Sequence, residues 1–235
     1  MINNIELFPT PEKEKETPFG RDPLLNKLKE AGVSPELIKE VEERLKDGLT
    51  GLPKAETAQK IIEDLVKEGR KINIEFNDIR YLKIYNETIG HEKTNEMLRE
   101  IGRVYQEEVE KLQNEGVKIL IARYAGDEFL IIVADKNPEE AEKYFDQIDR
   151  ALRNIRKQKQ AEVPFGFHFS RGKASLEELP PEERNFSNLI ALADKRALEA
   201  KRKAHARLVE RAKRKPPKKY KLTRKLVERI KRYPI

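Results

Sequence analysis

Hydrophobic and polar positions alternate along the chain with two periods, one typical of helices and one typical of strands. Apolar residues at helical spacing predict helices over residues 57–69, 95–116, 138–158 and 185–215. Apolar runs bounded by turn residues predict strands within residues 71–79, 117–135 and 163–175. This alternation of helices and strands predicts an α/β (α+β) domain in which helices pack on a mixed or antiparallel sheet.

The first 46 residues have a different pattern. Residues 1–20 are rich in Pro and charge and have no apolar period, so we expect a disordered lead. Residues 21–46 predict two short helices, the second beginning with Ser34 as N-cap and Pro35 in the first turn. Residues 21–46 are therefore a candidate dimerisation segment.

One interruption of an apolar run indicates chemistry. The run 117–135 is broken by Ala125, Gly126 and Asp127, which predicts a hairpin whose tip presents Asp127, while Gly126 lets the backbone approach a ligand closely. The strand over residues 71–79 contains a second acid, Asp78, near its end. If the strands are neighbours, the two carboxylates converge at one sheet edge, a pairing that suits Mg²⁺. From these residues alone, metal-assisted phosphoryl transfer and two solvated turn acids are equally good interpretations.

Composition sets broad limits on the protein. The chain has 235 residues, 37% of them hydrophobic, which predicts one main domain. It has no cysteine, and it shows neither an apolar run of membrane-spanning length nor an apolar signal segment, so we expect a cytoplasmic protein with no transmembrane segment. A charged fraction of 39% without Trp or Cys is typical of proteins from hot environments.

The positive charge belongs to the end of the chain. Residues 201–235 hold 16 Lys and Arg and two Glu, a net charge of +14, whereas the whole chain carries +7. This segment fits a solvated helix extension, a nucleic-acid arm or a surface that binds anionic lipid. Aromatic residues there are only Tyr220 and Tyr233, which gives base stacking little support.

Several segments of the chain resemble one known family. The stretch "RYAGDEF" is similar to the signature of the GGDEF family, the diguanylate cyclases. Further likeness to motifs of this family is found, in the correct order over residues 47–205, in "DGLTGLPKAETA", "NDIRYLKIYNETIGHEKTNEML", "HFSRGKAS" and "LADKRALEAKRKAH". The resemblance implies a domain over residues 47–205, followed by a basic tail over residues 206–235.

The resemblance also implies a fold and a reaction. Members of this family have a fold like a polymerase palm and join two GTP molecules into cyclic di-GMP with Mg²⁺ or Mn²⁺. Carried over by position, Asp78, Asp127 and the carbonyl of Ile79 would bind the metal. Asp127 or Glu128 would help to activate the attacking 3′-hydroxyl, with catalysis also assisted by Lys83.

Nucleotide contacts follow from the same alignment. Lys83 and Lys201 fall where the family grips the triphosphate, and the backbone amides of residues 79–83 would cradle it. Asn86 falls where the family contacts guanine, and Gly126 is the signature glycine beside the nucleotide. Each active site handles one nucleotide, so activity would require a homodimer.

The chain also departs from the family pattern. Ala125 replaces the first signature glycine, and Asn95 replaces an Asp at a base-reading position. His205 stands where an Arg often contacts phosphate. Gly116 and Ile119 occupy the places of the family's inhibitory Arg and Asp, so we expect no product feedback at that site.

Two further function classes stay open beside a nucleotide-joining enzyme. One is a degenerate, non-catalytic module that keeps the palm fold and binds nucleotide, nucleic acid or another polyanion through the basic tail. The other is a component of a palm-type polymerase. The retained Asp78, Asp127, Glu128 and Lys201 favour the enzyme, whereas the departures and the tail favour the alternatives.

Overall fold

The chain folds around one antiparallel sheet. The structure, a computed structural model, describes residues 28–158, 167–214 and 232; the predicted lead, most of the first predicted helix and most of the basic tail lie outside them. Neighbouring strands are antiparallel throughout, in the order β2-β3-β1-β4. The four strands are β1 (Ile72–Ile79), β2 (Ile119–Arg123), β3 (Glu128–Ala134) and β4 (Phe169–Ser175). The predicted sheet is confirmed in its antiparallel form.

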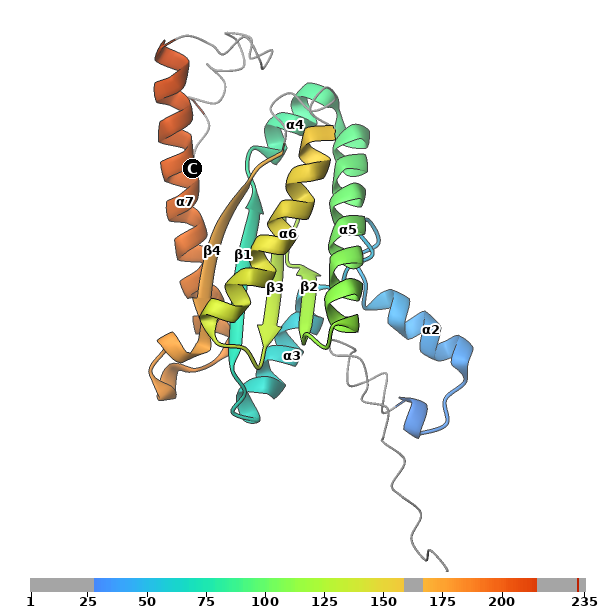
Figure 1. Cartoon of the computed structure of the whole chain (residues 1–235). Helices are drawn as coiled ribbons and strands as arrows, with labels where there is room; N and C mark the ends of the chain where they lie inside the picture. Colours follow the sequence, from blue (N-terminus) through green and yellow to red (C-terminus); the bar gives the residue numbers. More distant parts are fainter. Residues whose placement is uncertain (1–27, 159–166, 215–231, 233–235) are drawn as a thin grey trace, which may run out of the picture.

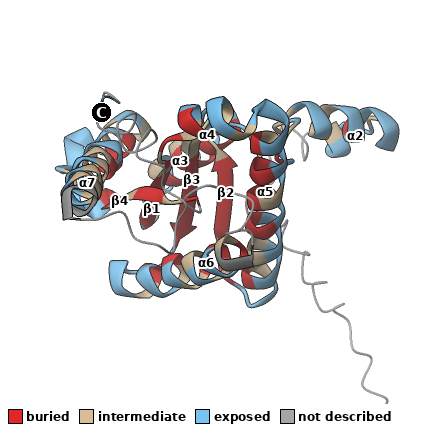
Figure 2. Ribbon diagram, turned by 90° about the horizontal axis from the view of Figure 1, so that it is seen from above, coloured by how far each residue is buried: buried red, intermediate tan, exposed pale blue. Residues whose placement is uncertain are grey.

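Helices cover both faces of this sheet (Figures 1 and 2). One face packs against α5 and α6, and the other packs against α3 and α7. The described helices are α2 (Pro35–Arg44), α3 (Ala55–Lys67), α4 (Leu82–Ile89), α5 (His91–Asn114), α6 (Pro138–Gln158) and α7 (Phe186–Arg214), with short 3-10 turns at Leu176–Glu178 and Pro181–Glu183. Because side chains along a strand point alternately to the two faces of the sheet, there are two apolar cores. On β3, Phe129, Ile131 and Val133 pack towards α5 and α6. Leu130 and Ile132 of the same strand pack towards α3 and α7.

Helix α2 extends away from the sheet and its covering helices (Figure 1). It begins as the sequence predicts: the Ser34 side chain accepts a hydrogen bond from the Leu37 amide at 3.3 Å, and Pro35 stands in the first turn. Leu37 is 50% exposed, whereas Ile38 is buried. The role of this segment in dimerisation stays a prediction.

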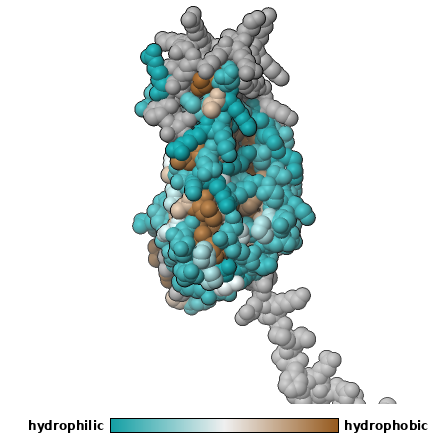
Figure 3. Space-filling model, turned by 90° about the vertical axis from the view of Figure 1, so that its left-hand side faces the viewer, coloured by the Kyte–Doolittle hydropathy of each residue, from teal (hydrophilic) through white to brown (hydrophobic). Residues whose placement is uncertain are grey.

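Helix α7 continues without interruption from Phe186 past residue 205 to Arg214. Its exposed residues include Arg202, Lys203 and Arg207. The side of the molecule that carries α7 is largely hydrophilic, with small hydrophobic patches (Figure 3). The described residues include no helix that could span a membrane.

A buried charge lies in the centre of the sheet. The side chain of Glu75 on β1 is 2% exposed and lies 3.6 Å from Nε of Arg171 and 3.4 Å from Nζ of Lys173, both on β4. These two cations also pair with Asp149 and Glu142 of α6. Burial raises the pKa of Glu75 despite the opposing effect of the cations. Ion pairs therefore join α6 to the sheet beside the apolar core.

Candidate active site

Two strand ends bring the acids together. Asp78 of β1 is paired in register with Glu128, the first residue of β3, and Asp127 directly precedes Glu128. The Ile79 amide donates a hydrogen bond of 2.8 Å to the carbonyl of Asp127. The predicted hairpin between β2 and β3 is present, and its strand β3 is a neighbour of β1, so the acids lie at the same end of adjacent strands.

Arg123 fixes the turn that carries Asp127. Its guanidinium donates to a carboxylate oxygen of Asp47 at 2.8 Å and to the carbonyl of Gly126 at 2.7 Å. The same Asp47 oxygen accepts from the amide and the hydroxyl of Thr50, at 2.8 and 2.7 Å. Partial burial acts to raise the pKa of Asp47, but the hydrogen bonds from Arg123 and Thr50 outweigh this effect and lower the pKa. The segment beginning at Asp47 is thereby fastened to the acidic hairpin.

The two small residues of the turn have different consequences. Ala125 exchanges backbone hydrogen bonds of 3.2 and 3.3 Å with Glu128, so the methyl group in place of the family's glycine is compatible with a closed turn. A Cβ added at Gly126 would meet no atom within 4 Å. Packing does not require glycine there, which leaves space for a ligand beside the backbone.

Lys201 reaches this site from α7. Its Nζ lies 2.8 Å from Oδ2 of Asp78, with the Lys201 and Asp78 side chains 21% and 14% exposed. The second oxygen, Oδ1 of Asp78, is buried and has no hydrogen-bond partner. Burial raises the pKa of Asp78 against the opposing effect of Lys201, and the charges of Asp127 and Asp194 raise it further. The carboxylate is therefore held by one cation and keeps free acceptor capacity.

Glu128 is the second acid with a shifted pKa. Burial raises the pKa of Glu128, and the negative charges of Asp127 and Asp78 raise it further. The ammonium of Lys201 acts in the opposite direction. The site therefore combines acids that repel one another with the nearby ammonium of Lys201.

Two residues that the sequence analysis did not single out belong to this neighbourhood. Asp194 of α7 interacts electrostatically with both Asp78 and Glu128. Its signal in the sequence was its place seven residues before Lys201, about two helical turns along one face. Ser170 of β4 is paired in register with Asp78, is 2% exposed, and its Oγ has no hydrogen-bond partner.

The turn after β1 corrects one prediction. Two of the amides expected to cradle a triphosphate are already bound within the protein: Ile79 donates to Asp127, and Arg80 donates to the carbonyl of His168 at 2.8 Å. The cradle predicted from residues 79–83 is therefore wrong for these two amides. Leu82 and Lys83 open α4, where the first amides have no partner within the helix.

The remaining predicted nucleotide residues lie on α4, α5 and α7. Lys83 is exposed on α4, and Asn86 and Asn95 are partly exposed on α4 and α5, two helices joined at Gly90. The structure gives no contact between these side chains and the acids, so their roles stay predictions. His205 reaches the turn after β1 from α7: its Nδ1 is 3.2 Å from the hydroxyl of Tyr81, the residue before α4.

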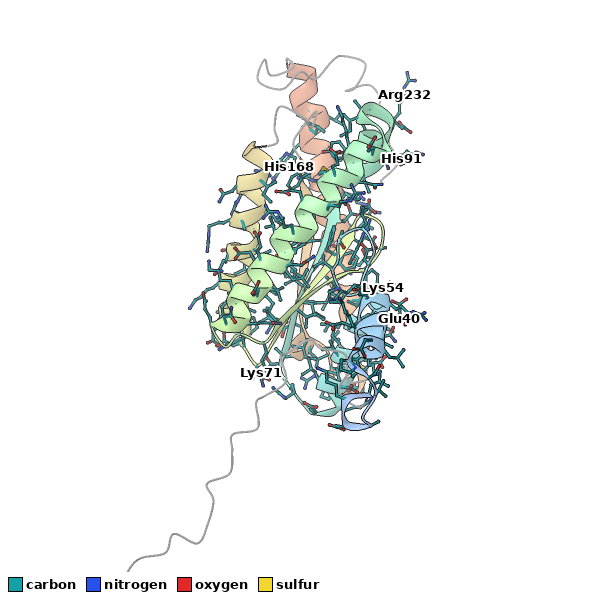
Figure 4. The ribbon with its side chains drawn as sticks, turned by 90° about the vertical axis from the view of Figure 1, so that its right-hand side faces the viewer. Glu40, Lys54, Lys71, His91, His168 and Arg232 are labelled. Carbon is teal, nitrogen blue, oxygen red and sulfur yellow. The ribbon has the colours of Figure 1, made fainter. Side chains whose placement is uncertain are left out.

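The acids fit a metal ion that also takes ligands from a substrate. Among the described residues, no group of three or more His, Asp or Glu side chains could hold an ion by itself. His91 lies exposed at the start of α5, at the upper end of the molecule in Figure 4. Mg²⁺ commonly binds one or two carboxylates and completes its coordination with water and phosphate oxygens. The free Oδ1 of Asp78, beside Asp127 at the next strand end, is suited to that arrangement.

Comparisons with known proteins agree on one domain type. A family model described as "Diguanylate cyclase, GGDEF domain" matches residues 44–207. The probable diguanylate cyclase DgcJ of Escherichia coli is 24% identical over 140 residues, which are 58% of this chain and 27% of that protein. The cyclic di-GMP phosphodiesterase PdeB of Shewanella oneidensis is 27% identical over 90 residues, 38% of this chain and 10% of that protein. These matches therefore span only a minor part of each curated relative.

Solved structures show the same fold. The GGDEF domain of DgcB from Caulobacter crescentus, in complex with c-di-GMP, has a TM-score of 0.55 at 21% identity, covering 67% of this chain and 90% of that one. Diguanylate cyclase SiaD from Pseudomonas aeruginosa, in complex with its activator SiaC, has a TM-score of 0.58 at 20% identity, covering 77% and 68%. At these identities the likeness establishes the architecture.

Proposed function

Because the chain belongs to the GGDEF family, whose model covers residues 44–207, we propose that it joins two nucleoside triphosphates into a cyclic dinucleotide, which is cyclic di-GMP when both are GTP. The observation that carries this proposal is the meeting of Asp78 with Glu128 across paired strands, with Asp127 adjacent. Lys201 adds a cation at 2.8 Å from Asp78. Acids with a nearby lysine match the needs of a metal-bound triphosphate.

The proposed reaction consists of two identical nucleotidyl transfers. The 3′-hydroxyl oxygen of one nucleotide forms a bond to the α-phosphorus of the other and loses its proton. The bond from that phosphorus to the bridging oxygen of the β-phosphate breaks, and pyrophosphate leaves. Mg²⁺ or Mn²⁺, when bound, lowers the pKa of the hydroxyl and neutralises charge on the pyrophosphate. Asp78, Asp127 and the carbonyl of Ile79 are the proposed protein ligands.

Glu128 is the better candidate to accept the hydroxyl proton. General bases work best when their pKa lies near the operating pH. Burial and neighbouring acids raise the pKa of Glu128 from its usual acidic range. Asp127 is then proposed to serve mainly as a metal ligand.

The proposal includes a homodimer and a relaxed choice of base. Each site holds one nucleotide, so two copies must face each other. Residues 21–46, with Leu37 exposed on α2, are the candidate contact between the copies.

The proposed phosphate contacts are Lys83, Lys201 and His205, and Gly126 lies beside the nucleotide. Asn86 and Asn95 are the proposed base contacts, and Asn95 admits ATP as well as GTP. The basic tail is proposed to bind polyanions, nucleic acid among them.

A non-catalytic binding module is the second candidate. It is favoured by one observation from the comparisons: a match of 90 residues falls within a protein named a cyclic di-GMP phosphodiesterase, of which it covers 10%. A domain of this type can therefore occur as a minor part of a protein with a different named activity. Such a module would bind nucleotide without joining it.

Product identification separates the two candidates. The pure protein is incubated with Mg²⁺ or Mn²⁺ and each nucleoside triphosphate, alone and in pairs, and the products are identified by mass. We expect a cyclic dinucleotide and pyrophosphate. If the dimeric protein binds a triphosphate and the metal but forms no product with any of them, the enzyme proposal is wrong and the binding module remains.

A further inference from the structure

We propose that Lys201 competes with the divalent metal ion for Asp78, and that this competition makes metal and nucleotide bind as a pair. The inference rests on the proposed function, since it assumes that Asp78 is a metal ligand. In the structure the lysine ammonium lies 2.8 Å from Oδ2 of Asp78, where it occupies the place of a cation. Lys201 would then have two partners in turn, the carboxylate before loading and phosphate after it.

The surroundings of Asp78 explain why a cation is needed there. The Asp78 side chain is only 14% exposed, and Asp127 and Asp194 add negative charge nearby. A mostly buried carboxylate that loses its partner carries a large desolvation cost. Without metal or nucleotide, Lys201 supplies the compensating charge.

The packing of α7 fixes the base of the Lys201 side chain. One turn earlier on the helix, the Ala197 amide nitrogen would lie 2.4 Å from a Cβ placed on Gly172 of β4. Helix and strand are therefore in close contact at that level, and the α7 backbone cannot shift towards β4. The exchange then needs only rotation of the flexible lysine side chain, whose four-carbon stem allows its ammonium to move between neighbouring anions.

Charge balance then distinguishes free metal from metal that carries a triphosphate. A free ion that takes Asp78 displaces Lys201 and leaves two cations beside one another. A metal bound to a triphosphate brings phosphate oxygens that give the displaced ammonium a new partner. The site therefore binds free metal weakly and binds the metal and nucleotide cooperatively. Linkage requires this effect to be reciprocal, and typical coupling is about 5- to 150-fold.

The test compares metal binding with and without nucleotide. Mn²⁺ binding is measured by electron paramagnetic resonance for the wild-type chain and for Lys201→Met, first alone and then with a non-hydrolysable GTP analogue. For the wild type we expect the analogue to increase Mn²⁺ affinity about tenfold or more. For Lys201→Met we expect tighter binding of Mn²⁺ alone, weaker binding of the analogue, and little coupling between the two.

Two further variants make the result specific. Lys201→Arg keeps the charge and is expected to retain weak binding of free Mn²⁺, which separates the effect of the charge from the effect of any substitution at this position. Lys203→Met removes an exposed lysine about 200° around the same helix and is expected to behave as the wild type.

Different failures have different meanings. If Lys201→Met loses affinity for the analogue but binds Mn²⁺ alone no more tightly than the wild type, Lys201 only binds phosphate and the exchange is wrong. If Mn²⁺ binds neither protein even with the analogue, the metal site of the proposed function is itself wrong, and the exchange fails with it.

Discussion

Gly172 of β4 lies directly against Ala193 of α7: a Cβ on Gly172 would stand 1.9 Å from the Ala193 carbonyl oxygen. Backbone atoms cannot yield as a flexible side chain can, so this glycine determines how closely the helix approaches the sheet. The same helix carries Lys201 to Asp78. The fit between one strand and one helix therefore contributes to the geometry of the candidate site.

Gly172→Ala tests this contact. We expect the free energy of unfolding to fall by about 1–3 kcal/mol, because the added methyl group forces α7 away from β4. Urea denaturation measures the change. Gly126→Ala is the matched control for stability, since its Cβ would meet no atom within 4 Å, and its effect should stay within about 0.5 kcal/mol. Equal effects of the two variants would contradict the close approach of α7.

Asp127→Ala is expected to abolish nucleotide joining while the protein stays folded. Asp127 is partly exposed in a turn, so removing its carboxylate costs little stability, but the change removes a proposed metal ligand. Product formation is measured by mass, and folding by circular dichroism. Wild-type activity in this variant would contradict the metal assignment.

Glu128→Gln is expected to stabilise the protein at neutral pH. The raised pKa of Glu128 means that its ionised form is disfavoured in the folded state, so its contribution to stability is complete below the unfolded pKa and is lost as pH rises through the folded pKa. The variant should therefore be more stable than the wild type at pH 7, and the difference should shrink as the pH falls through the raised folded pKa and disappear below the unfolded pKa of about 4. Urea denaturation across pH checks this, and a constant difference would exclude the titration of Glu128 as its cause.

Asn95→Asp is expected to shift base choice towards GTP. The pairing edge of guanine offers two adjacent donors, which a carboxylate can accept together, whereas an amide matches only one of them. One good base contact is worth about 1–3 kcal/mol, or roughly one to two decades of selectivity. Equimolar ATP and GTP in competition measure the product ratio. An unchanged ratio would show that this position does not set base choice.

Removal of residues 215–235 is expected to weaken binding to polyanions. The deletion takes away nine Lys and Arg residues and one Glu, and it leaves α7 complete to Arg214. The affinity of the full chain for duplex DNA should fall steeply as the salt concentration rises. The logarithm of the binding constant should fall linearly with the logarithm of the salt concentration, with a slope of about −0.9 for each phosphate neutralised. Vesicles of anionic lipid are the parallel probe. Binding that is insensitive to both salt and the deletion would remove the nucleic-acid interpretation.

The parts of the fold that follow from local pattern could be predicted. Strong periods placed α2, α3, α5, α6, α7 and the strands, and the interruption at residues 125–127 placed the acidic hairpin, whereas the short helix α4 was not predicted. Motif spacing led to Asp78, Asp127 and Lys201, which lie in one region. Such features depend on residues close together in the sequence or on a resemblance, and both are visible without coordinates.

The features that were missed depend on long-range packing. Ser170 meets Asp78 only through the register of β1 with β4, and Asp194 approaches the acids only through the rotation of α7 over the sheet. The amides of Ile79 and Arg80 were predicted to be available because their partners, Asp127 and His168, come from other parts of the chain. Apart from the helical spacing of Asp194 and Lys201, no local period encodes these pairings.

The charge network around Glu75 makes stability depend on temperature in a particular way. Charged groups lose part of their hydration free energy on heating, so the cost of burying Glu75 and of partly burying Arg171 and Lys173 decreases as temperature rises. The stabilisation from apolar contacts per unit of area levels off over the same range. The desolvation of these charges therefore lowers the free energy of unfolding most at low temperature and least at high temperature.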